Sequence, residues 1–143
     1  MRIILFNALI LAAVPLAVQA DDFRITPGKY SSTTTMKMPM MPNGMQRTVE
    51  SCLTEKEANL SPAELAQEMS GSQNCSVDKL KQSSTTMSFE FQCTEGEMGS
   101  VTGRYNMSGG GDNFTFSGEM DGSIQGQAVN VSVKGTSKRI GDC

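Results

Sequence analysis

The chain has 143 residues and a formal net charge of −3, with 12 lysines and arginines against 15 aspartates and glutamates. It contains no basic block, which argues against nucleic acid and anionic membrane surfaces as partners. It also contains no histidine, and this excludes catalytic triads and general bases that depend on an imidazole. Because no other catalytic constellation is recognisable, we expect a protein that is not an enzyme and carries no cofactor.

Residues 1–20 have the pattern of a secretory signal peptide. Arg2 gives a positive start, the run from Ile3 to Val18 is almost wholly apolar, and Ala20 ends a stretch of small residues suited to cleavage. The apolar run is somewhat short for a membrane-spanning helix. We therefore expect cleavage after Ala20, no stable membrane anchor afterwards, and a single exported domain formed by residues 21–143.

Two strands are expected in the first third of that domain. Lys29–Met38 is rich in β-branched and hydroxyl-bearing residues, and its even-numbered side chains share one face. Two prolines and an Asn-Gly pair within residues 39–44 predict a loop. Gln46–Leu53 is then the second strand.

Thr54–Ser70 is the only stretch with a helical pattern. Ser61 is a good N-cap, Pro62 suits the first helical position, and Gly71 suits the C-terminal end. A shorter helical turn at residues 54–57 is an additional possibility. We expect one short amphipathic helix, or two, packed on a sheet.

The segment Cys75–Cys93 has the pattern of a β-hairpin with a disulfide across its open end. If the chain turns at residues 83–85, Cys75 lies directly opposite Cys93, at the side-chain spacing that a disulfide needs. The same register places Val77 opposite Phe91 and Lys79 opposite Phe89.

Four cysteines in an exported chain indicate two disulfides, for which three pairings are possible. The hairpin favours Cys75–Cys93, and this leaves Cys52 to pair with Cys143. With no histidine and no C-x-x-C motif, the cysteines do not have the pattern of zinc ligands.

The last third of the chain predicts three more strands, centred on residues 101–107, 114–120 and 129–133, each alternating apolar and polar residues. The expected fold is mainly β: a curved antiparallel meander of about seven strands, as a half-barrel or open barrel, with one short helix and two disulfides. Glycines within these strands, at positions 103, 118 and 135, are expected bend points.

Methionine is over-represented in one segment, residues 36–45. It holds five thioethers, which belong to Met36, Met38, Met40, Met41 and Met45. The cluster has three interpretations: core packing, because methionine fills gaps readily; an adaptable apolar surface for a greasy ligand or partner; and a Cu(I) or Ag(I) site, because thioethers are soft ligands.

Four local motifs occur in order along the chain: Thr26-Pro27-Gly28-Lys29-Tyr30, Cys52-Leu53-Thr54, the pair Cys75 and Cys93, and Lys138-Arg139-Ile140-Gly141-Asp142-Cys143. Together they resemble the bacterial exported family known as domain of unknown function 3617. The resemblance implies a periplasmic, disulfide-bonded, mostly β protein from a Gram-negative bacterium. A methionine-rich segment before the Cys-Leu-Thr motif also looks similar in other members, which favours packing or an apolar surface over a metal site. The family supplies no activity and no functional residues.

The expected function is non-enzymatic binding, in the periplasm, of an unknown apolar ligand or envelope protein. The concave sheet face and the methionine-rich loop are the expected site, with Tyr30, Met38, Met40, Met41 and Met45 as its residues. One alternative is Cu(I) or Ag(I) binding by segment 36–45. The other is a purely structural envelope component.

Overall fold

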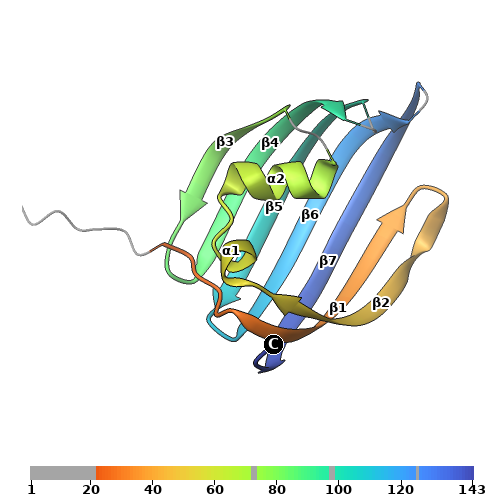
Figure 1. The fold of residues 1–143 in the computed structure, drawn as a ribbon. Helices are drawn as coiled ribbons and strands as arrows, with labels where there is room; N and C mark the ends of the chain where they lie inside the picture. The colour runs from red at the N-terminus through yellow and green to blue at the C-terminus, as the bar shows by residue number, and fades with distance from the viewer. Residues whose placement is uncertain (1–21, 72–73, 97–98, 125) are drawn as a thin grey trace, which may run out of the picture.

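A computed structural model describes residues 22–71, 74–96, 99–124 and 126–143, so the expected signal peptide lies outside the described residues. The described chain forms one open sheet of seven antiparallel strands and two helices (Figure 1). The elements are β1 (Gly28–Met38), β2 (Met41–Leu53), α1 (Glu55–Ala58), α2 (Pro62–Ser70), β3 (Asn74–Gln82), β4 (Thr86–Gly96), β5 (Gly99–Gly110), β6 (Asn113–Ile124) and β7 (Gln127–Gly141). In this part of the chain, none of the helices has the length and apolarity to cross a membrane.

The strand order is β2-β1-β7-β6-β5-β4-β3, which confirms the expected curved antiparallel sheet. Strands β3 to β7 follow one another as a meander, and the β1–β2 hairpin joins them because β1 pairs with β7. The two edges, β2 and β3, are joined by the segment that carries α1 and α2. The sheet is strongly curved, and the helices lie over its concave face (Figure 1). One long connection therefore crosses the concave side from edge to edge.

The bridged hairpin has the predicted register over its first half. Cys75 pairs with Cys93 and Val77 with Phe91, and the disulfide joins the first pair across a Cα–Cα distance of 4.1 Å. The prediction that Lys79 lies opposite Phe89 is wrong, because the register shifts between Asp78 and Lys81.

Burial explains that shift. Phe89 is 1% exposed, and a lysine directly opposite it would have its ammonium group drawn out of water, which is costly. Instead Lys79 takes a positive φ of 51°, and its side chain reaches Glu90 at 2.8 Å on the exposed side of the hairpin. A β-bulge thus keeps the charge in solvent.

The second disulfide, Cys52–Cys143, fixes the edge strand β2 to the C-terminus. Lys29 of β1 pairs with Cys52 on one side and with Gly141 of β7 on the other. The last two residues of the chain therefore only have to cross one strand, and the two Cα atoms lie 5.5 Å apart.

The loop expected at residues 39–44 is shorter than predicted. Only Pro39 and Met40 form the turn, and β2 begins at Met41. The extra residues are taken up by an irregularity in the ladder between Met36 and Met38, where Gly44 has a φ of 75°. β2 is an edge strand. A proline at position 42 is therefore tolerated there, whereas on a central strand it would remove a ladder hydrogen bond.

The helical segment has a strong capping signal at each helix. Thr54 and Ser61 are the N-caps of α1 and α2, and each forms a capping box with a glutamate three residues later. α2 ends at Gly71 with a φ of 65°. It packs mainly on β3 and β4, where Ala66 is completely buried, so the capped helix lies toward one side of the concave face.

Candidate ligand-binding cleft

A cleft of about 720 Å³ lies between the helical segment and the concave face of the sheet. Its floor consists of large inward-facing side chains from β4, β5 and β6, namely Met87, Tyr105, Met107, Phe114 and Phe116. The opposite wall comes from the N-terminal segment, the end of β2 and the helical segment, with Phe23, Ile25, Leu53, Ala58, Leu60 and Leu65. Apolar side chains therefore line both walls.

The aromatic floor depends on glycines in the neighbouring strands. Tyr105 of β5 lies directly opposite Gly118 of β6, and Phe116 of β6 lies directly opposite Gly135 of β7. A Cβ atom built on Gly135 would lie 2.5 Å from Cζ of Phe116, so the ring occupies the place that a side chain would take. These glycines, expected as bend points, make room for the rings that form the floor.

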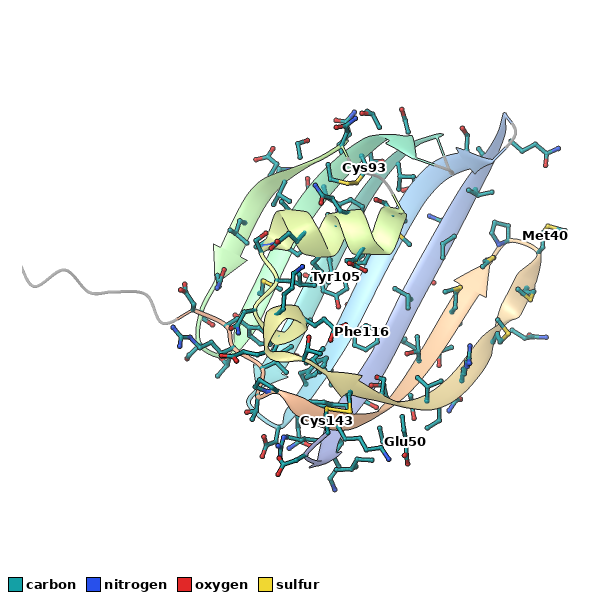
Figure 2. The ribbon with its side chains drawn as sticks, in the orientation of Figure 1. Met40, Glu50, Cys93, Tyr105, Phe116 and Cys143 are labelled. Carbon is teal, nitrogen blue, oxygen red and sulfur yellow. A yellow bond between two sulfur atoms is a disulfide. The ribbon has the colours of Figure 1, made fainter. Side chains whose placement is uncertain are left out.

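The rings also support one another across the strands. The centroid of Tyr105 lies 5.6 Å from that of Phe89 and 6.5 Å from that of Phe116. Phe114 continues the row at 6.4 Å from Phe116. These spacings fall in the range of favourable aromatic pairs, so the floor is a continuous row of rings. Tyr105 and Phe116 lie on the side of the sheet where the helices are (Figure 2).

Tyr105 supplies a polar group within this apolar floor. Burial raises the pKa of its phenol, so the hydroxyl stays protonated and can donate a hydrogen bond. Among the described residues, nothing is hydrogen-bonded to it, and no buried polar side-chain atom is left without a partner. The hydroxyl therefore reaches space that a ligand or water can enter.

The mouth of the cleft is polar. Asp22, Arg24, Glu57 and Glu68 line the cleft and are exposed, so charges of both signs are present where the cleft opens to solvent. Glu57 accepts hydrogen bonds from Thr54, which hold the pKa of its carboxyl below the ordinary value. A mostly apolar interior with a charged rim suits a molecule that has an apolar body and a polar end.

Tyr30, one of the expected site residues, has a structural role. It is 2% exposed, and its hydroxyl donates to the carbonyl oxygens of Thr26 at 2.6 Å and Gly111 at 3.0 Å. Burial, reinforced by the nearby carboxylate of Asp112, raises the pKa of the phenol. Tyr30 contacts the cleft only indirectly, because its ring packs on Phe114 at a centroid distance of 5.6 Å.

The expected methionines lie on the β1–β2 hairpin, outside the lining of the cleft. Met36 and Met38 are half-buried and pack against the core. Met41 is 42% exposed, Met45 is 54% exposed and Met40 is 93% exposed, at the tip of the hairpin (Figure 2). The structure brings the hairpin methionines together but leaves Tyr30 near the other end of β1.

The floor residues were not identified as a site from the sequence. Alternation along the strands indicates that Tyr105, Met107, Phe114 and Phe116 face inward, but inward-facing aromatic residues normally form a core. What makes them a cleft floor is the position of α2, which packs on β3 and β4 and leaves the middle of the concave face open. That position depends on tertiary contacts and has no local sequence signal.

Comparison with known proteins gives a family. The model of the family described as "Protein of unknown function (DUF3617)" matches residues 25–143, so the chain belongs to this family. Neither a curated protein nor a solved structure matches the chain. The suspected resemblance is thus confirmed.

Proposed function

Because the description of this family states no activity, we propose a function from the cleft itself: the protein binds a lipid-like molecule, with its apolar chain on the aromatic floor. The observation that carries the proposal is the cleft of about 720 Å³ lined by apolar side chains from both the sheet and the helical segment. Ligand sites typically have volumes of about 300–1,000 Å³, mostly apolar walls and few polar groups.

The hydroxyl of Tyr105 indicates a second property of the ligand, a hydrogen-bond acceptor. It is a neutral donor on the floor, and among the described residues it has no hydrogen-bond partner. A carbonyl, ester or carboxyl oxygen of the ligand would satisfy it. The ligand class is therefore an acyl chain that carries an acceptor oxygen, as in fatty acids and acyl lipids. An envelope protein that inserts an apolar segment is the alternative occupant.

The proposal includes a periplasmic location. It is supported by the signal-peptide pattern of residues 1–20 and by two disulfides in a small domain, since disulfides persist in oxidising compartments. A carrier or scavenger of acyl lipids is useful there, because a lipid crossing an aqueous space must have its chain shielded from water.

Titration with a dansyl-labelled medium-chain fatty acid tests the proposal. We expect saturable fluorescence enhancement with the wild-type protein. Tyr105→Phe keeps the ring and loses the donor, and a net hydrogen bond of about 0.5–1.5 kcal/mol corresponds to roughly 2- to 10-fold weaker binding.

Met40→Leu is the matched control, because Met40 lies outside the cleft and is 93% exposed. It should bind like the wild type. Fluorescence that does not saturate with the wild-type protein would overturn the proposal. An affinity that falls equally in Tyr105→Phe and Met40→Leu would also overturn it. Saturable binding of an apolar peptide but not of the fatty acid would favour the envelope-protein alternative.

A further inference from the structure

Four thioethers share one face of the β1–β2 hairpin. In the register of the hairpin Met36 pairs with Met45, and Met38 pairs with Met41. Directly paired residues point to the same face, with Cβ atoms about 4.5–5.5 Å apart. Met36 and Met38 pack against the core, so this shared face is the inner one. The hairpin therefore holds two cross-strand methionine pairs next to each other.

Core packing accounts for only half of this cluster. Met36 and Met38 are half-buried, but Met41 and Met45 are 42% and 54% exposed on the edge strand. Methionine is usually a buried residue, and these two side chains gain little from burial. These two exposed side chains are paired in register with two methionines that pack against the core.

The backbone fixes the spacing of the two pairs. Gly44 has a φ of 75°, in a region that favours glycine. A Cβ atom there would lie 3.0 Å from Cγ of Lys37 and 3.2 Å from the carbonyl oxygen of Met36. The irregularity at Gly44 lets both methionine pairs stay in register on either side of Lys37.

We propose that Met36, Met38, Met41 and Met45 form a binding site for a soft monovalent cation, Cu(I) or Ag(I). Thioethers are soft, neutral donors, and these ions favour them over oxygen ligands. All four cysteines are bound in disulfides, and the chain has no histidine. Among the described residues, no group of three or more acidic or cysteine side chains is placed to hold a metal. Methionine is thus the soft ligand that this protein offers.

Silver titration of the oxidised protein in nitrate buffer tests the site, because Ag(I) needs no reductant and leaves the disulfides intact. We expect one ion per chain and shifts in the methyl NMR signals of these four methionines. Met41→Leu combined with Met45→Leu keeps the apolar surface and removes two donors, and should weaken binding at least tenfold. The matched control Met40→Leu should leave the affinity unchanged.

The pH dependence separates this site from carboxylate binding. Thioethers do not take up protons in water, so the Ag(I) affinity should be the same at about pH 7 and about pH 4, whereas carboxylates protonate near pH 4. Unmoved methyl signals, equal affinities of the wild type and the double variant, or a steep loss of binding in acid would each overturn the proposal. Tyr105→Phe should not alter silver binding, so this test is independent of the lipid proposal.

Discussion

Replacing Gly135 with alanine should damage both the sheet and the floor of the cleft. Gly135 has no positive φ, so the effect comes from space alone. The new Cβ would lie 2.5 Å from Cζ of Phe116 and 2.7 Å from the carbonyl oxygen of Thr33. The ring would have to tilt into the cleft, and β1 would have to move away from β7.

Overpacking of this kind costs about 1–3 kcal/mol. With a urea dependence of about 1–3 kcal/mol per molar, the unfolding midpoint should fall by roughly 1 M. Affinity for the labelled fatty acid should fall in the same variant, because the tilted ring of Phe116 occupies ligand space.

Gly118→Ala is the matched control. Its Cβ would meet Cδ2 of Tyr105 at 3.2 Å and Cγ1 of Val133 at 3.3 Å, distances that small side-chain movements can relieve. We expect a loss of less than about 1 kcal/mol. If both variants unfold at the same urea concentration, or if Gly135→Ala is as stable as the wild type, the ring-over-glycine explanation is refuted.

Three further predictions concern stability. Replacing both Cys75 and Cys93 with alanine opens a link between residues 18 apart in sequence and should cost about 3 kcal/mol in urea unfolding; an unchanged midpoint would contradict this. Ser61→Ala removes the side chain that caps α2 and should cost about 1 kcal/mol, whereas the exposed substitution Ser100→Ala should leave the urea midpoint unchanged. Hydrogen bonds from Ser61 hold the pKa of Glu64 below its ordinary value. The stability that these hydrogen bonds contribute is therefore present above the ordinary pKa of a glutamate and is lost as pH falls through the lowered pKa of Glu64. The stability of the wild type should thus decline more in acid than that of Glu64→Gln. Parallel declines of the two proteins would argue against this role of Glu64.

Much of the fold was predictable because its determinants are local or pairwise. The spacing of Cys75 and Cys93 determines a hairpin register, and alternation along the later strands identifies their inner faces. The capping residue Ser61 marks the start of α2 for the same reason. The prediction that Lys79 lies opposite Phe89 was wrong because the bulge that removes Lys79 from the buried face depends on Phe89. Only the folded hairpin brings these two residues close.

The site was less predictable. The methionine cluster is visible in the sequence, but the turn at Pro39 and Met40, which pairs the thioethers across two strands, was expected to be a six-residue loop. Tyr30 was expected beside the methionines, yet it lies near the start of β1, whereas the methionines lie at its other end and on β2. The cleft exists because α2 packs mainly on β3 and β4, and nothing in residues 62–70 indicates how far the helix extends over the sheet.

Native mass spectrometry of the protein, isolated from cells under mild conditions, tests the lipid-binding proposal most directly. We expect a heterogeneous series of lipid-sized added masses on a chain that carries both disulfides. Leu65→Lys, which places an ammonium group in the wall of the cleft, should lose these masses, whereas Leu80→Lys, at an exposed position on β3, should retain them. A bare wild-type chain that also takes up no added acyl lipid would contradict the account.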